Sequence, residues 1–563
     1  MRKCLTRISL IIICIITFLS RTLGQWSKVF VDGAVIFRGQ DSWYHMRLAQ
    51  VLKANFPNYL HNDYFVNPSG QPPAGYPPFL TGLIATPTLP FSERITEIWG
   101  ALLPPLLAVG TVVVVYFLAK TVLRSRGYAL VAALLVGVLP TQFFQKTLLG
   151  FTDHHMLEVF FFSLSLLLLF KKKYLLLGLA LGALSWTWAG AGYIILVLTF
   201  GVAVAMYQKR LRGVKITRLG LGFAFALSIA GLLFSLIGKN SVTRTESLAC
   251  LVVGALIPLT LLALNHIRNT KVFAYAAPLI GVLALINLWI FLPITSWWGA
   301  VFNRGSSAVI GEMTPLTFTS AFSNFGLILL LAIPGLIIFL RKERSWILPA
   351  VTIPLLISSI NQIRFTYYLV IPAVLFSTYF IVYISSKLRE NAKLAVSITI
   401  IIFIFMTSLV NIIKTAAFEN TMSPNMYTAL TWIRYNTPEP GGNWYSLQSN
   451  PSDYQVLAWW DYGSWVAYVS RRTPLTSPQG AYLPQMTEFW LDGDIDKLEQ
   501  HAEKVYGDGN VNVRYVVLEK SDMKVDWVKH LTGETEQNRL WIFDSREWYW
   551  AYSNSEVFVL ESR

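Results

Sequence analysis

The chain has 563 residues, of which 54% are hydrophobic and only 14% are charged. In soluble proteins about a quarter of all residues are usually charged. A mean hydropathy of +0.49 requires repeated apolar runs of membrane-spanning length. The composition excludes a secreted, fibrous, disordered or cytosolic protein and indicates a polytopic membrane protein. The net charge of +15 is uneven, because residues 418–563 hold 12 Lys and Arg against 20 Asp and Glu, a net of −8, which leaves +23 upstream. This basic excess lies in short loops, so it indicates membrane topology rather than nucleic-acid binding.

The N-terminal apolar run is interpreted as the first membrane span. Residues 8–19 follow Arg2, Lys3 and Arg7 and would suit the core of a signal peptide, but no convincing small-residue cleavage site follows. The three cysteines lie in or beside apolar runs, which excludes a disulfide framework and a cysteine-based metal site.

Thirteen apolar runs are long enough, or nearly long enough, to cross a membrane as helices. They fall at about residues 5–24, 96–118, 127–145, 156–170, 174–189, 191–207, 217–237, 247–264, 273–293, 324–340, 346–360, 365–385 and 394–413. Two long outer loops separate spans at about residues 25–95 and 294–323. We therefore predict a transmembrane domain at 1–414, which includes both loops, and a soluble domain at 415–563.

Lysine and arginine are concentrated in alternate loops, and the positive-inside rule places these loops in the cytoplasm. Apart from the long first loop, the opposite loops hold only Lys146, Lys239, Arg244, Arg304 and Arg364. This alternation predicts a multi-pass protein of the cell membrane whose N-terminus is cytoplasmic. The long outer loops and the C-terminal domain would then lie outside the cytoplasm.

The C-terminal domain is predicted to be a compact mixed α/β domain. Residues 513–518 and 555–560 have the composition of strands, and the polar run at 493–505 has that of a helix. The domain also contains turn-rich stretches such as residues 436–442.

Four residues with metal-binding side chains crowd into the outer segment at 150–158: Asp153, His154, His155 and Glu158. Carboxylates and imidazoles without a thiolate suit a hard divalent cation such as Mn²⁺ or Mg²⁺. Asp153 and His155, two residues apart, can converge on one ion. The alternative is that Asp153 is a solvated helix cap favoured by the helix dipole.

Three further polar residues lie on the same predicted face of the membrane. Asp41 stands among aromatic residues in the first outer loop, and Glu312 is the single acid of the long loop at 294–323. Long loops often act as lids. Arg364 lies at the outer end of a span, where a guanidinium can bind a phosphate through two hydrogen bonds. The alternatives are an ordinary surface glutamate at Glu312 and a snorkelling side chain at Arg364.

Residues 459–463 read WWDYG, in which an acid follows two adjacent tryptophans. Such a group can form a shallow pocket that accepts a hydroxyl from a peptide. The alternative is a strand and turn whose aromatic side chains pack in a core.

This string is identical to the WWDYG signature of the catalytic subunit of oligosaccharyltransferase, and the chain resembles that family over its whole length. The resembling segments, in the family's order, are the first acidic motif at 39–41 (GQD), the second at 153–155 (DHH), the TIXE-type motif at 309–312 (VIGE), the phosphate-binding arginine at Arg364 and the signature at 459–463. The resemblance implies a GT-C type fold of about 13 transmembrane helices with an extracytoplasmic α/β domain.

Three features depart from the common pattern of the family. His155 stands where many members have Asp, which resembles the archaeal form, and Val309 replaces Thr. The segment 521–531 fits neither the DxxK nor the MxxI helix of the family, and Met523 marks the corresponding place for acceptor binding. A C-terminal domain of about 150 residues resembles that of a compact single-subunit prokaryotic enzyme.

The resemblance implies a metal-dependent and inverting transfer of a glycan. Asp41, Asp153 and His155 would bind Mn²⁺ or Mg²⁺, and Glu312 would join them when its loop closes. Asp41 and Glu312 would hydrogen-bond the NH₂ group of an acceptor Asn and weaken its amide conjugation, so that the nitrogen displaces the carrier at the anomeric carbon. His154 and Glu158 are additional candidates at this site.

The resemblance also implies the two substrates. The donor would be an oligosaccharide on a polyprenyl (dolichyl) phosphate or diphosphate, with Arg364 on the phosphate. The acceptor would be a polypeptide with Asn-X-Ser/Thr, bound through the residues Glu312, Trp459, Trp460, Asp461, Tyr462, Gly463 and Met523. One alternative is another polyprenyl-phosphate-sugar-dependent transferase that acts on hydroxyl or lipid acceptors, which would need no hydroxyl pocket of this kind. A transporter is a remote alternative, since its ionisable groups would lie near the bilayer midplane.

Overall fold

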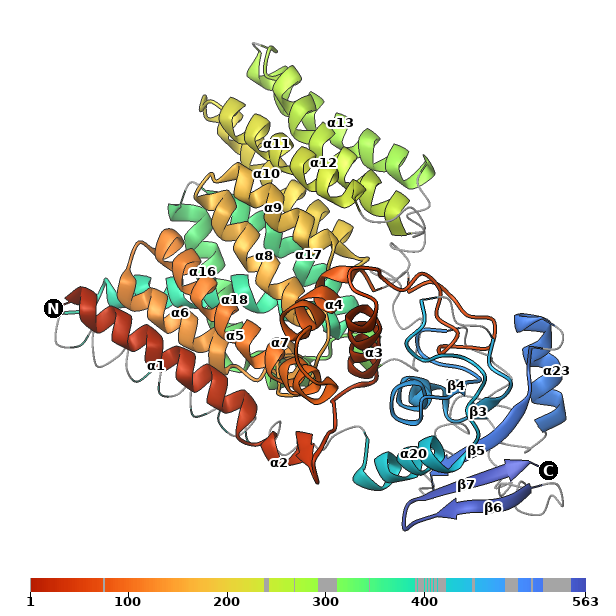
Figure 1. Cartoon of the computed structure of the whole chain (residues 1–563). Coiled ribbons are helices and arrows are strands. Elements are labelled where there is room, and N and C mark those ends of the chain that lie inside the picture. Colours follow the sequence, from red (N-terminus) through yellow and green to blue (C-terminus); the bar gives the residue numbers. More distant parts are fainter. Residues whose placement is uncertain are drawn as a thin grey trace. The chain divides into compact units, whose positions relative to one another are not determined.

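The computed structural model describes most of residues 2–562. It leaves out residues 74–75, 237–242, 268, 292–310, 344, most of 390–421, 448–450, 481–494, 508–509 and 520–547. The chain forms two compact units (Figure 1). The helical unit comprises Met1–Gln25, Pro104–Leu148 and His154–Phe418, and the globular unit comprises Trp26–Leu103, Leu149–Asp153 and Glu419–Arg563.

Twelve of the thirteen predicted spans coincide with helices in the described part of the chain. These are α1 (Arg2–Thr22), α5 (Glu93–Leu123), α6 (Arg126–Val138) with α7 (Gln142–Gln145), α8 (His155–Phe170), α9 (Tyr174–Ser185), α10 (Ala191–Leu211), α11 (Thr217–Ser235), α12 (Thr243–Leu264), α13 (Thr270–Phe291), α16 (Leu327–Lys342), α17 (Ile347–Asn361) and α18 (Thr366–Ser385). Most of the thirteenth, at 394–413, lies outside the described residues. Among the residues that the structure describes, five helices, α1, α5, α10, α11 and α18, are long and apolar enough to cross a membrane by themselves. A total of thirteen spans stays a prediction.

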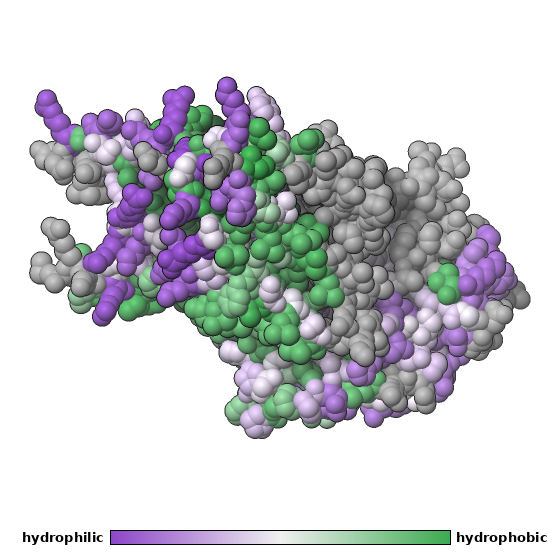
Figure 2. Space-filling model, turned by 90° about the horizontal axis from the view of Figure 1, so that it is seen from above, coloured by the Kyte–Doolittle hydropathy of each residue, from purple (hydrophilic) through white to green (hydrophobic). Residues whose placement is uncertain are grey.

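The helical unit is built by close packing of apolar helices. α11 packs against α9 and α12, α10 against α12 and α17, α16 against α18, and α1 against α6. At Gly335 in α16 a Cβ atom would lie 2.0 Å from the Phe376 carbonyl oxygen of α18, so this crossing requires glycine. Outward positions such as Leu221, Phe225 and Leu232 are exposed, as expected for lipid-facing side chains. Figure 2 shows hydrophobic residues over a broad area of this unit and hydrophilic side chains gathered at its left end.

One helix pair in the helical unit is sharply bent. α15 (Phe318–Phe325) precedes α16, and the two meet at 89°. α15 begins with a capping box between Thr317 and Ser320, which satisfies amide groups at its N-terminus. The bend follows at Gly326, whose φ of +53° suits glycine.

The globular unit contains the first outer loop, which is folded. Strands β1 (Phe30–Val31) and β2 (Ala34–Val35) form a hairpin whose turn residues, Asp32 and Gly33, both have positive φ. The short helix α2 (Trp26–Val29) precedes the hairpin, and α3 (Gln40–Ala54) and α4 (Pro78–Ala85) follow it. Residues 42–52 of α3 are all buried. Because every face is covered, the segment lacks the apolar stripe by which a surface helix is recognised.

The C-terminal part of the globular unit is a mixed α/β fold, as predicted. A five-stranded sheet has the order β4-β3-β5-β7-β6, in which β3 is parallel to β4 and β5, and β7 is antiparallel to β5 and β6. The strands are β3 (Gln455–Leu457), β4 (Thr473–Pro474), β5 (Val513–Glu519), β6 (Trp548–Ser553) and β7 (Val557–Ser562), and the longer helices are α20 (Pro424–Asn436) and α23 (Ile495–Tyr506). The two strands and the helix expected at 513–518, 555–560 and 493–505 are confirmed as β5, β7 and α23.

Candidate active site

Asp41 lies in the first turn of α3, where the positive end of the helix dipole favours an acid. The preceding Gly39 has a φ of +74°, and a Cβ atom there would lie 3.4 Å from the Phe151 ring. The Asp41 carboxylate accepts hydrogen bonds from Tyr76 Oη at 3.1 Å and Gln479 Nε2 at 2.8 Å. Burial and the charge of Asp41 raise the pKa of Tyr76 well above its usual value, so its hydroxyl remains a donor.

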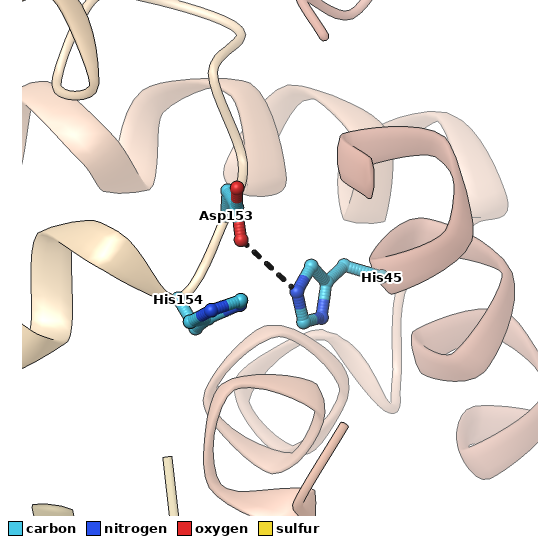
Figure 3. A group of neighbouring side chains, drawn as sticks. All are labelled: His45, Asp153 and His154. Carbon is cyan, nitrogen blue, oxygen red and sulfur yellow. Dashed lines mark ion pairs between the residues drawn. The ribbon is translucent and has the colours of Figure 1, made fainter. Parts of the chain in front are cut away.

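Asp153 lies within ion-pair distance of a histidine, His45, that no sequence motif had marked. His45 Nε2 lies 3.4 Å from Asp153 Oδ1, and both side chains are buried (Figure 3). Asp153 is therefore not a solvated helix cap. His154, which follows it in the chain, is the N-cap residue of α8 and makes no side-chain capping bond. The position of His45, four residues after Asp41, would have suggested a shared helix face if α3 had been recognised.

The WWDYG residues form a short turn rather than a strand. Residues Trp460–Tyr462 make one turn of 3₁₀ helix, and α21 (Gly463–Trp465) continues from it. Trp459 and Tyr462 are buried, whereas Trp460 and Asp461 are partly exposed. The turn thus presents part of Trp460 and Asp461 to solvent, while Trp459 and Tyr462 are packed inside.

Tyr462 anchors this turn to the central sheet. Its hydroxyl donates to Glu519 Oε2 at 2.5 Å, and its ring stacks on Trp465 at a centroid distance of 4.3 Å. Burial and the neighbouring Glu519 carboxylate raise the pKa of Tyr462. The expectation of a packed aromatic core thus describes Tyr462, but not Trp460 or Asp461.

A chain of hydrogen bonds joins Asp41 to the end of the WWDYG turn within the globular unit. Ser464 Oγ donates to Gln479 Oε1 at 2.6 Å, and Gln479 Nε2 donates to Asp41. Gln479 and Asp41 are 438 residues apart in the sequence. No local pattern marked Gln479 or Tyr76, because neither belongs to a chemically distinctive string.

Glu158 and two histidines meet at the start of α8 in the helical unit. His155 Nδ1 lies 3.0 Å and His154 Nε2 3.3 Å from Glu158 Oε1. Tyr367 Oη, from α18, lies 3.3 Å from Glu158 Oε2, and Tyr368 Oη also donates to that oxygen. Thus His154 and Glu158 lie beside His155, as the motif density suggested.

Glu312 lies in a short 3₁₀ helix (Gly311–Met313) of the helical unit and is half-buried. Lys146 Nζ is 2.8 Å and His155 Nε2 is 3.9 Å from its Oε2 atom. Burial opposes ionisation of Glu312, but the charges of Lys146, His155 and Arg364 outweigh burial and lower its pKa to about 2. Glu312 is therefore a carboxylate at neutral pH, and it is not an ordinary surface glutamate.

Arg364 lies in the 3₁₀ helix Ile363–Phe365, next to the segment of Glu312. Backbone hydrogen bonds join the two segments, from Ile363 N to Thr314 O at 2.9 Å and from Leu316 N to Ile360 O at 3.1 Å. The guanidinium packs 5.2 Å from the Phe365 ring, and within the described residues its Nε atom is buried without a hydrogen-bond partner. Lys146, Tyr367 and Tyr368 are the residues of this group that the motif analysis did not assign.

The predicted site residues are thus divided between the two units. Asp41, Asp153 and residues 459–463 belong to the globular unit, and His154, His155, Glu158, Glu312 and Arg364 belong to the helical unit. Met523 lies outside the described residues. The structure brings together the members of each set.

The side chains at these positions suit a divalent cation. Ligand atoms of His154, His155 and Glu158 lie within 4.8 Å of one another, and all three residues are buried. His45 and Asp153 offer a second imidazole and carboxylate, close enough for an ion pair. These nitrogen and oxygen donors, with no thiolate among them, fit Mn²⁺ or Mg²⁺.

Comparison with known proteins gives two family matches that together cover most of the chain. Residues 8–347 match the N-terminal model of the oligosaccharyl transferase STT3 family, and residues 423–523 match the AglB core domain. The dolichyl-phosphooligosaccharide-protein glycotransferase 2 of Archaeoglobus fulgidus is 26% identical over 584 residues, which cover 94% of this chain and 88% of that protein.

Solved structures of archaeal oligosaccharyltransferase share the fold. The A. fulgidus AglB in complex with an inhibitory peptide and a dolichol-phosphate superposes with a TM-score of 0.81 at 22% identity, covering 93% of this chain and 70% of that one. An A. fulgidus oligosaccharyltransferase tethered to an acceptor peptide with the NVT sequon gives a TM-score of 0.79 at 22% identity, covering 99% of this chain and 74% of that one.

Proposed function

Since this chain belongs to the oligosaccharyl transferase STT3 family, we propose that it transfers a glycan from a dolichyl or polyprenyl phosphate carrier to Asn in Asn-X-Ser/Thr sequences. The protein is a glycosyltransferase and a multi-pass membrane protein. The proposal concerns the substrates, the residues that act on them and the metal.

The observation that carries the proposal is the hydrogen-bonded link between Asp41 and the WWDYG turn. Gln479 accepts from Ser464, directly after the turn, and donates to Asp41. Transfer to a sequon needs two contacts at a fixed separation, one to the Asn amide and one to the hydroxyl two residues later. The two hydrogen bonds through Gln479 would hold the acid and the proposed hydroxyl-binding turn at such a separation.

Asp41 and Glu312 would activate the acceptor. An amide nitrogen is a poor nucleophile because its lone pair is delocalised into the carbonyl. Two carboxylates that accept hydrogen bonds from the NH₂ group favour a geometry in which this conjugation is weakened. The low pKa of Glu312, about 2, keeps it ionised and able to accept. The nitrogen then attacks the anomeric carbon, the bond to the carrier phosphate breaks with inversion of configuration, and the proton that the nitrogen loses passes to a carboxylate that accepted its hydrogen bond.

Mn²⁺ or Mg²⁺ would be held by Asp41, Asp153 and His155, with Glu312 joining them in the closed loop. When bound, the ion stabilises negative charge on the departing phosphate oxygen. Arg364 would hold the phosphate group at the membrane edge, where its guanidinium can form two parallel hydrogen bonds. Arg364 is close enough to Glu312 to lower its pKa. This position supports the role, because the phosphate of the glycan donor must lie close to the acceptor Asn that Glu312 would contact.

Trp459, Trp460 and Asp461 would bind the Ser or Thr of the sequon. The partly exposed Asp461 can accept the hydroxyl hydrogen, and the tryptophans supply the pocket wall. Tyr462 and Gly463 maintain the turn, and Met523 would complete the acceptor site. The orientation implied by basic loops places this site outside the cytoplasm, and the enzyme would act as a single subunit in the cell membrane.

Acceptor specificity tests the proposal. Purified protein with native lipid extract and Mn²⁺ is incubated with fluorescent peptides containing Asn-X-Thr, Gln-X-Thr or Asn-X-Ala, and products are identified by mass spectrometry. We expect glycopeptide only from Asn-X-Thr. Equal transfer to the Asn-X-Ala peptide would contradict the proposed pocket for the Ser or Thr hydroxyl. Transfer only to lipid or hydroxyl acceptors would favour the alternative transferase.

A further inference from the structure

Glu158 is a buried acid of α8 to which the proposed transfer reaction gives no task. Its side chain has no exposed surface. A carboxylate inside an apolar helical bundle is costly unless donors compensate for the water it has lost. Such a residue is therefore expected to serve a specific purpose.

Four side chains provide that compensation, and they divide evenly between the two oxygens. Oε1 lies 3.0 Å from His155 Nδ1 and 3.3 Å from His154 Nε2. Oε2 accepts from the hydroxyls of Tyr367 and Tyr368. All five residues belong to the helical unit. Since a carboxylate offers about four acceptor positions, little capacity is left for a metal ion.

We propose that Glu158 is a positioning residue that fixes the ring of His155 so that Nε2 is the metal-binding atom. This inference rests on the proposed function, in which His155 is a ligand. A neutral imidazole carries one proton, and donation of Nδ1–H to the carboxylate leaves the lone pair on Nε2. That atom lies 3.9 Å from Glu312 Oε2, so it is turned toward another residue of the proposed site. A carboxylate in this position also makes the imidazole a stronger ligand.

The same contacts distinguish between the two adjacent histidines. His154 turns Nε2 toward Glu158, whereas His155 turns Nδ1 toward it. The ring of His154 packs at 4.6 Å from the ring of His155 and stacks on Trp188 at 6.4 Å. Glu158 thus contacts opposite nitrogens of the two rings, so that in the proposal His155 presents Nε2 to the ion, whereas His154 has its Nε2 toward Glu158.

The test measures Mn²⁺ affinity of the purified full-length protein in detergent, without lipid donor or peptide, by titration calorimetry. Glu158→Gln keeps the side-chain volume but replaces the acceptor of the His155 proton. We expect Mn²⁺ to bind about 10–100-fold more weakly, as for other residues that orient metal ligands. Ser165→Ala, which changes another buried polar group of α8, is the matched control and should alter the affinity less than about twofold.

A double-mutant cycle separates positioning from direct ligation. If Glu158 acts through His155, then Glu158→Gln costs nothing further in a His155→Ala background. If Glu158 is itself a ligand, the two losses add, and the inference is overturned. Where glutamine prevents folding, Glu158→Asp keeps the charge for Tyr367 and Tyr368 but shortens the reach to His155, and it should also weaken Mn²⁺ binding.

Unchanged Mn²⁺ affinity in folded Glu158→Gln would refute the positioning role, as would a wild-type protein that binds no Mn²⁺. These results are distinguishable from failure of the proposed function, because peptide glycosylation is measured separately. Normal glycosylation with an unchanged Glu158→Gln affinity refutes only the inference. If the double-mutant cycle gives the expected Mn²⁺ affinities but no glycopeptide forms, only the proposed peptide acceptor is refuted.

Discussion

Glu312 in the helical unit and Asp41 in the globular unit are the two acids proposed to contact the acceptor amide, and the described contacts of their side chains differ in kind. In the helical unit, Glu312 contacts Lys146 and His155, and Glu158 contacts two histidines and two tyrosines. In the globular unit, Asp41 accepts hydrogen bonds from the neutral Tyr76 and Gln479. Hydrogen bonds from neutral groups hold a carboxylate in place without cancelling its charge. The comparison teaches that a carboxylate can be held in place with or without a neighbouring positive charge. Variants can test these two properties separately.

The largest effect is expected from loss of the two acids proposed to contact the acceptor amide. Asp41→Asn and Glu312→Gln keep the shape of each side chain but remove its charge. We expect kcat/KM for the Asn-X-Thr peptide to fall by about 10²–10³-fold or more, since both groups act on the reacting centre. Asp32→Asn, an exposed acid of the same globular unit as Asp41, should retain the wild-type rate. Full activity of Asp41→Asn would contradict the proposed amide activation.

A buried ion pair with no proposed role in the reaction tests how strongly the stability of the globular unit depends on charge. Arg47 donates to both oxygens of Asp63, at 2.6 and 3.0 Å, and to Trp444 O at 3.0 Å. Arg47→Met leaves Asp63 buried without its cation, and this should cost about 3–5 kcal/mol of stability. Thermal unfolding in detergent measures the loss.

The matched variant is Arg514→Met, which breaks a more exposed pair with Glu561 in the same unit. Its expected cost is about 1 kcal/mol or less. Equal destabilisation by the two variants would show that burial does not determine the contribution of these pairs.

Asp461→Ala should affect binding of the acceptor more than the chemical step. Asp461 is partly exposed at the WWDYG turn, and the proposal gives it a contact with the Thr hydroxyl. Loss of one such hydrogen bond to a charged group costs about 1.5–3 kcal/mol, equivalent to about 10–100-fold in KM. Steady-state kinetics with varied peptide would show it. A fall in kcat with unchanged KM would instead place Asp461 near the reacting atoms.

The smallest effect is expected at an ion pair of the helical unit whose arginine is exposed. Arg124 lies 3.5 Å from Glu343, and the arginine side chain is 79% exposed. Glu343→Gln should change stability by about 1 kcal/mol or less, because water and salt screen such pairs. Glycan transfer should be unaffected. A large loss of stability would show that solvent exposure does not weaken ion pairs in this unit.

The sequence predicted the helical unit well because the bilayer imposes a simple rule. A helix that crosses it needs a long apolar run, and twelve of thirteen such runs are helices among the described residues. The chemically rare strings, WWDYG and the cluster at 153–158, could also be found, because they bring unusual residue types together along the chain.

Contacts between distant segments could not be predicted in this way. α3 contains Asp, Trp, His and Arg side chains and is covered on every face, so it shows no helical stripe. Without that helix, His45 could not be placed beside Asp153. Gln479 is an ordinary residue type until folding brings it 2.8 Å from Asp41. The sequence showed Lys146 only as one of the few cations in the predicted outer loops. Its ion pair with Glu312 could not be predicted, because the two residues meet only in the folded chain.

The most direct test of the central claim is glycan transfer to a fluorescent Asn-X-Thr peptide by purified protein with native lipid extract, measured in Mn²⁺, in EDTA and after Mn²⁺ is restored. We predict that glycopeptide forms in Mn²⁺, stops forming in EDTA, and resumes when the ion is returned. Transfer at the full rate in EDTA, by protein shown to contain no bound metal, would contradict the proposed role of Asp41, Asp153 and His155. Absence of product with a lipid extract that a related enzyme can use would contradict the proposed acceptor.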